Sequence, residues 1–355
     1  MPMPSPKKTA AWAALAFLLA LVFVLMQSRS RSSVPAGEGS DPASRAASGS
    51  RSLKVDRDRV AAPGKRTFQE AFALSQQNGE RRLTAEQIDA FVNARNRNAD
   101  SLLSAFRLGG DQAFLKEAME RFPDHPQVLM TSLSQVQDAE KRLAILENLK
   151  RVDPNNAMGN CMAARALLQL GRKDEALEEL RKSIGKSVDD FTVALAQNDE
   201  EAFLFSGLPP AQAKLMALFG SSKSLVLQFR DLGDEMAKMG KDFQAGGDEL
   251  SAESLRGIQS GLGQQLQGSG TLVDFLVGRL VEKRAIEGVD SEETQARLEV
   301  LDQQKQNLTG KAKQVMELIK DPSVAEGDWL LYFDRAKLFG EAAANDWMLE
   351  KYPQP

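Results

Sequence analysis

DPNNAMGNCMAARALLQLGRKDEALEEL, residues 153–180, is the stretch that decides how this chain folds. It contains two runs rich in Ala, Leu and Glu, residues that favour helices, separated by Gly171. Pro154 precedes the first run, where a missing backbone N–H costs little, and glycine is the residue that most readily ends a helix. The stretch therefore predicts a helix, a short turn and a second helix.

The same arrangement occurs once more directly upstream. Pro123 and Pro154 lie 31 residues apart, and each follows a segment rich in Ala, Leu and Glu. Residues 123–154 and 154–185 each contain two such helical segments with a short turn between them. Self-similarity at this period indicates stacked helix pairs.

The second of these units resembles the tetratricopeptide repeat, a helix pair of about 34 residues. Five residues match the family's small, turn and large apolar positions: Ala164, Ala176, Gly171, Leu167 and Leu180. The resemblance extends over roughly residues 99–185 and implies that the first helices of successive pairs line a groove that binds segments of partner proteins. The groove positions that it implies are Cys161, Arg165, Leu168 and Gln169.

The match to the family is incomplete. Asn160 stands where the family has a large aromatic residue. In the preceding unit, residues 123–154, Arg142 stands where the family has a small residue. The alternative is an ordinary helical bundle with coincidental prolines and glycines.

Longer helices are predicted after Phe191. Two segments carry apolar residues at heptad spacing: Leu225, Phe229, Leu232, Met236, Met239 and Phe243 in the first, and Leu298, Leu301, Leu308, Ala312, Val315 and Ile319 in the second. Two further helical segments lie between them, separated by Gly268, Ser269 and Gly270. We therefore expect an all-α chain, with a repeat domain at 67–190 and a bundle of antiparallel helices at 191–355.

The N-terminus contains 17 consecutive apolar residues, 10–26, between Lys7-Lys8 and Arg29. A helix of this length is just able to cross the hydrocarbon core of a membrane. No small-x-small site follows it, so we expect an uncleaved single-span anchor, with a cleaved signal peptide as the alternative. The charges on the two sides are nearly balanced, but a short N-terminal tail favours a body on the extracytoplasmic side of a bacterial cytoplasmic membrane.

Residues 27–66 are rich in Ser, Ala, Gly, Arg and Pro and predict a disordered tether, whose basic residues either contact lipid headgroups or are simply solvated. Residues 1–67 contain 11 Lys and Arg against 4 Asp and Glu, whereas the whole chain has a formal net charge of −4. The remainder is therefore acidic. Nucleic-acid binding is not expected of it, because phosphate contacts require a basic face.

Few residues are available for catalysis. His125 is the only histidine and Cys161 the only cysteine, so a multi-histidine zinc site and an intramolecular disulfide are both excluded. His125 lies between two prolines, where a structural or solvent-facing role is the simplest, and Cys161 is expected to be a small buried residue. We expect no active site, no metal and no cofactor.

These observations predict a membrane-anchored, non-enzymatic scaffold that binds other proteins through a helical-repeat groove. The alternative is a structural envelope protein that self-associates through its long second-half helices. A homo-oligomer is compatible with both hypotheses.

Overall fold

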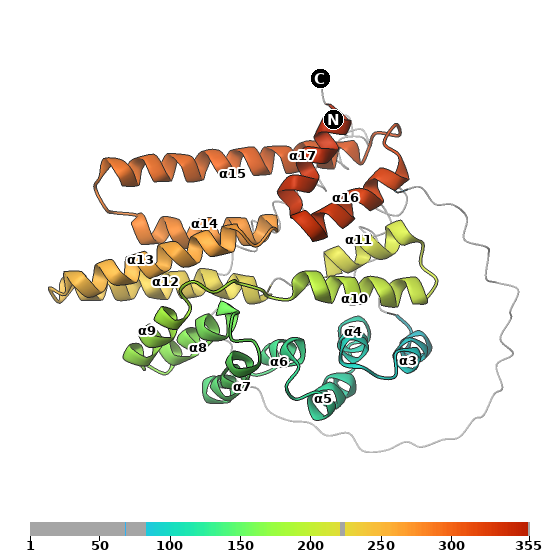
Figure 1. Ribbon diagram of the computed structural model, residues 1–355, viewed down its shortest axis with the longest axis horizontal. Coiled ribbons are helices and arrows are strands. Elements are labelled where there is room, and N and C mark those ends of the chain that lie inside the picture. Colours follow the sequence, from blue (N-terminus) through green and yellow to red (C-terminus); the bar gives the residue numbers. More distant parts are fainter. Residues whose placement is uncertain (1–67, 69–82, 221–223, 354–355) are drawn as a thin grey trace, which may run out of the picture. The chain divides into compact units, whose positions relative to one another are not determined.

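The computed structural model describes Phe68, residues 83–220 and residues 224–353, all within one compact unit, Lys65–Pro355 (Figure 1). The predicted span at 10–26 and the tether at 27–66 lie outside the described residues. In the described part of the chain, no helix combines the length and the apolar character that crossing a membrane requires. Within the same ranges there is no β-strand, only an isolated bridge between Asn156 and Ser187, so the all-α prediction is confirmed.

The helices before residue 190 are α3 (Ala85–Ala94), α4 (Ala99–Gly109), α5 (Gln112–Arg121), α6 (Pro126–Leu133), α7 (Ala139–Val152), α8 (Ala157–Gln169) and α9 (Lys173–Lys182). Those after it are α10 (Thr192–Phe205), α11 (Pro210–Gly220), α12 (Ser224–Ala245), α13 (Glu249–Gln267), α14 (Leu272–Ile286), α15 (Glu292–Leu318), α16 (Glu326–Phe339) and α17 (Glu341–Lys351).

Local sequence signals set the helix ends. Thr84 and Gln87 form a reciprocal capping box at α3, in which each side chain accepts a hydrogen bond from the other residue's backbone N–H, at 3.3 and 3.0 Å. Gly110 ends α4 with a φ of 79°, a left-handed conformation that glycine adopts without steric cost. Asp111 and Asn156 cap α5 and α8 through their side chains.

Helices α4 to α9 pack in pairs, as α4 with α5, α6 with α7 and α8 with α9. The pair quoted at the outset follows its prediction closely. Ala164 and Ala176 are both fully buried in one cluster, and Gly171 makes the turn with a φ of +76°. Small side chains at these positions let α8 and α9 approach closely, which explains their extensive contact.

The missing aromatic residue of this unit is replaced by a buried polar network. Asn160 donates to the Glu179 carboxylate at 2.8 Å and accepts from Lys186 at 2.7 Å. Lys150 of α7 also donates to Glu179, at 2.8 Å. Burial raises the pKa of Glu179, but its donors, Lys150 first, outweigh burial and hold the pKa below the usual range. Hydrogen bonds therefore link α7, α8 and α9 where the family pattern has an aromatic contact.

Helices α12, α13 and α14 lie side by side (Figure 1). Four residues of the first predicted heptad series, Phe229, Leu232, Met236 and Met239, are buried there. They belong to the same cluster as the interior of α6 to α9, so the two predicted domains share a core. The α13–α14 crossing is very close, because glycines face each other across it: Gly263 on α13 and Gly278 on α14.

A buried carboxylate ties α15 to this hairpin. Glu282 of α14 accepts hydrogen bonds from Gln264 and Gln267 of α13, at 3.0 and 2.6 Å, and from Arg297 of α15, at 2.7 and 3.0 Å. Burial raises the pKa of Glu282, but these donors, Arg297 first, leave the pKa below its usual range. The charge is thus retained in the interior because each carboxylate oxygen is satisfied.

A third cluster surrounds Trp329 of α16 and includes residues of α11, α15 and α17. Phe68 belongs to it: its ring stacks on Trp329 with centroids 4.5 Å apart and lies 5.9 Å from Phe333. Phe68 is thus held against α16 by aromatic contacts.

Candidate protein-binding surfaces

The predicted groove positions on α8 do not form an open surface. Cys161 is fully buried, and burial raises the pKa of its thiol to about 12, which confirms the small buried residue and makes a reactive thiolate inaccessible. Leu168 is half-buried against the central core. Gln169 alone of the four is exposed.

Arg165, the fourth position, contacts a helix of its own chain. Its guanidinium donates to Gln228 at 3.0 Å and pairs with Asp231 at 3.3 Å, both on α12, and its side chain is 18% exposed. Helix α12 thus occupies the face of α8 on which the resemblance places a partner segment. The family pattern could not show this, because the occupant lies some sixty residues downstream and is joined only by tertiary contacts.

The contacts of Arg142 explain why an arginine stands where the family pattern has a small residue. It donates to the carbonyl oxygens of Leu133 and Val136, at 2.7 and 3.1 Å, and to the side-chain oxygen of Gln228 at 3.1 Å. Burial, together with the nearby charge of Arg165, lowers its pKa. The long side chain closes the end of α6 and bridges to α12, and a small residue would remove these hydrogen bonds.

The α4–α5 pair also has an arginine that contacts a later helix of the chain. Arg107 of α4 binds Asp199 of α10 through two hydrogen bonds, at 3.0 and 2.6 Å. First helices of two pairs, α4 and α8, are therefore covered by α10 and α12 through arginine contacts. Among the four predicted groove positions, only Gln169 is therefore open to solvent.

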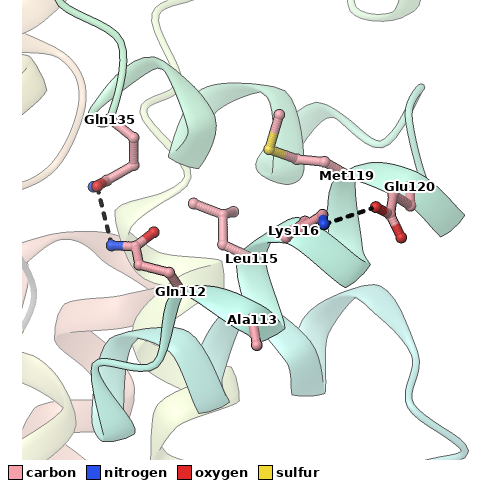
Figure 2. A pocket seen from close by; sticks show the side chains of 7 residues that line it. All are labelled: Gln112, Ala113, Leu115, Lys116, Met119, Glu120 and Gln135. Atoms are coloured by element: carbon pink, nitrogen blue, oxygen red, sulfur yellow. Dashed lines mark hydrogen bonds and ion pairs between the residues drawn. The ribbon is translucent and has the colours of Figure 1, made fainter. Parts of the chain in front are cut away.

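The described part of the molecule also has an open cavity of about 510 Å³ along α5 (Figure 2). Leu115, 3% exposed, and Met119, 42% exposed, supply its apolar side chains. Polar groups surround them: Gln112 donates to Gln135 at 3.2 Å, and Lys116 lies 3.9 Å from Glu120. We call this feature, with its seventh residue Ala113, the α5 cavity.

The sequence analysis did not identify the α5 cavity. Its only local signal is the pair Leu115 and Met119, four residues apart, which a single helix would place on one face as ordinary core. Gln135 comes from the turn after α6, so the concave shape depends on how α5 and α6 pack.

His125 stands at the N-cap of α6 without a side-chain capping bond, and its buried Nδ1 has no hydrogen-bond partner among the described residues. In the described ranges, no three His, Cys, Asp or Glu side chains are grouped as a metal site requires.

Comparison with protein-family models gives no match, and comparisons with curated proteins and with solved structures give none either.

Proposed function

We propose that this protein is a membrane-anchored, non-enzymatic scaffold that binds other proteins with its helical body. In this proposal residues 10–26 span the cytoplasmic membrane once, residues 27–66 are the tether, and the body lies on the extracytoplasmic side. Its paired helices α4 to α9 are degenerate tetratricopeptide-like repeats, which is consistent with the packing of α8 on α9 and with the burial of Ala164 and Ala176.

The observation that carries the scaffold proposal is the α5 cavity. Its partly exposed Met119 over the buried Leu115 is an apolar anchor point, and amides and opposite charges surround it. Flexible methionine and a polar rim suit a protein segment that inserts one apolar side chain. The cavity lies on a second helix of a pair, away from the Arg165 contacts that α12 already uses.

Site-specific crosslinking tests this proposal. The full chain, with a photoreactive amino acid in place of Met119, is irradiated in its native membranes, and covalent adducts are identified by mass spectrometry. The control carries the same group in place of Ile184, which is 62% exposed just after α9. We expect a defined protein adduct at position 119 that is absent at 184 and is weakened by Lys116→Glu. Identical adducts at both positions would refute a specific surface at the cavity.

The anchor is tested on the same material. Intact-mass measurement of the membrane-bound chain should show a mature N-terminus before residue 10. A chain that begins after Met26 would mean that the apolar run is a cleaved signal peptide.

Helix α15 supports the second candidate, self-association. It is 27 residues long, yet only Leu301, Val315 and Leu318 are buried, and residues 302–307 are exposed on every side. Val300 is 44% exposed and Leu308 is half-buried, so an apolar edge is available to another helix. Light scattering after size-exclusion chromatography of the detergent-solubilised full chain decides this: a dimer that Val300→Lys and Leu308→Lys dissociate would favour it, and a monomer would exclude it.

A further inference from the structure

Helix α16 carries a stripe of exposed apolar residues: Leu331, Leu338 and Phe339 are 51, 75 and 66% exposed. The spacing of seven and eight residues places them on one side of the helix. The opposite side is apolar as well, because Trp329 and Phe333 there belong to the core. We call the three exposed residues the α16 stripe. A helix that is apolar on both sides needs a second apolar environment beyond its own core.

The length of chain between the proposed membrane span and Phe68 supports the membrane as this apolar environment. Phe68, 2% exposed, stacks on Trp329 of the same helix, and 41 residues separate it from Met26 at the end of the proposed span. A random chain of that length has a root-mean-square end-to-end distance of about 35 Å. A helix with its side chains is only about 10–12 Å across. A tether of the proposed length is therefore long enough to let either side of α16, the helix on which Phe68 stacks, face the bilayer.

One basic side chain beside the α16 stripe, that of Arg335, suits contact with a lipid phosphate. Arg335 lies between Leu331 and Leu338 in the sequence, its guanidinium carbon is 4.8 Å from the ring centroid of Trp347, and it forms no ion pair within the described ranges. The neighbouring Lys337 is already paired with Glu200, at 2.8 Å. Arginine and tryptophan beside an apolar stripe are the residues that interfacial helices present to phosphates and acyl chains.

We propose that the α16 stripe inserts into the headgroup region of the same membrane that anchors the chain, with Arg335 contacting lipid phosphate. This inference rests on the proposed membrane anchor, and it adds a second, peripheral attachment that orients the body relative to the bilayer. Helix α16 would then lie flat on the membrane surface, and the α5 cavity on another cluster of the body would stay accessible to protein partners.

Fluorescence quenching in reconstituted vesicles tests the insertion. The full chain carrying Leu338→Cys is labelled with an environment-sensitive dye and reconstituted into vesicles of phosphatidylcholine and phosphatidylglycerol, with or without lipid spin-labelled near the headgroup. The matched control is Leu250→Cys on α13, because Leu250 is 81% exposed and is the one large exposed apolar residue of that helix among the described residues. The wild-type chain, labelled in parallel, reports any reaction of the buried Cys161.

We expect the spin-labelled lipid to reduce the emission of the dye at position 338 strongly and of the dye at 250 little. Arg335→Glu should weaken the quenching at 338 and leave the helical circular dichroism unchanged. Equal quenching at 338 and 250 overturns the proposal. The proposal is also overturned if the emission at 338 changes with the protein-to-lipid ratio but not with the quencher. A second copy of the chain would then cover the α16 stripe.

Flotation of the same vesicles distinguishes a failure of the proposed membrane anchor from a failure of the proposed insertion. If the chain washes off in high salt, the proposed membrane anchor is wrong and the insertion falls with it. If the chain stays with the vesicles but position 338 is not quenched, only the insertion is wrong.

Discussion

The close crossing of α13 and α14 makes a sharp prediction for Gly263→Ala. A Cβ atom at Gly263 would lie 2.6 Å from the backbone nitrogen of Glu282 and 2.6 Å from the carbonyl oxygen of Gly278. Both atoms belong to the backbone of α14, so no side-chain rotation relieves the overlap. The two helices must move apart, and the buried contacts of Glu282 must be disturbed with them.

The magnitude follows from two opposing effects. Alanine is favoured over glycine inside a helix by about 1 kcal/mol. Overpacking of a well-packed contact costs about 1–3 kcal/mol, and the overlap here lies at the severe end because backbone atoms meet. We expect Gly263→Ala to lower the free energy of unfolding by roughly 1–2 kcal/mol. Gly278→Ala should act similarly, since its Cβ would lie 2.5 Å from the Gly263 carbonyl oxygen.

Gly257→Ala is the matched control on the same helix. Gly257 is exposed, and a Cβ there meets nothing within 4 Å. The helix preference then acts alone, and stability should rise by about 0.5–1 kcal/mol. Urea and thermal unfolding of the detergent-solubilised full chain, followed by circular dichroism, measures both variants, with about 2–4 °C in Tm per kcal/mol for a body of this size. If Gly263→Ala stabilises as much as Gly257→Ala does, the close crossing does not exist.

Three further predictions concern buried contacts. Ala176→Trp should overpack the interior and cost on the order of 1–3 kcal/mol or more, whereas the exposed Lys173→Trp should cost little; equal melting temperatures would contradict the α8–α9 packing. Arg165→Glu should cost roughly 1–3 kcal/mol, because it removes two contacts to α12 and adds a carboxylate beside acidic residues, while Gln169→Glu stays within about 0.5 kcal/mol. The folded-state pKa of Glu282 is lowered, so its stabilisation is present above the usual Glu pKa and disappears as the pH falls through the folded value. Glu282→Gln should therefore be destabilised at pH 7, and its difference from wild type should shrink below about pH 4; a constant difference would show that the carboxylate charge is unimportant.

The sequence by itself determined the all-α class and the α8–α9 pair quoted at the outset. Helix starts and ends depend on residues within one turn, such as the Thr84–Gln87 box and Gly110, and such signals can be read from a short stretch of sequence. The spacing of apolar and small residues marks the buried side of each helix, so Ala176 and four heptad residues of α12, Phe229, Leu232, Met236 and Met239, were found in the interior as predicted.

Only the tertiary structure decided which faces remain open. Residues at the groove positions of α8 carry no local mark that α12 will cover them, because Arg165 and Gln228 are 63 residues apart and the choice between an intramolecular helix and a partner is made by long-range packing. The α5 cavity also requires residues from two elements, as Gln112 meets Gln135. Periodicity identifies a buried face, whereas what covers that face depends on the free energies of all competing contacts, which no short stretch of sequence contains.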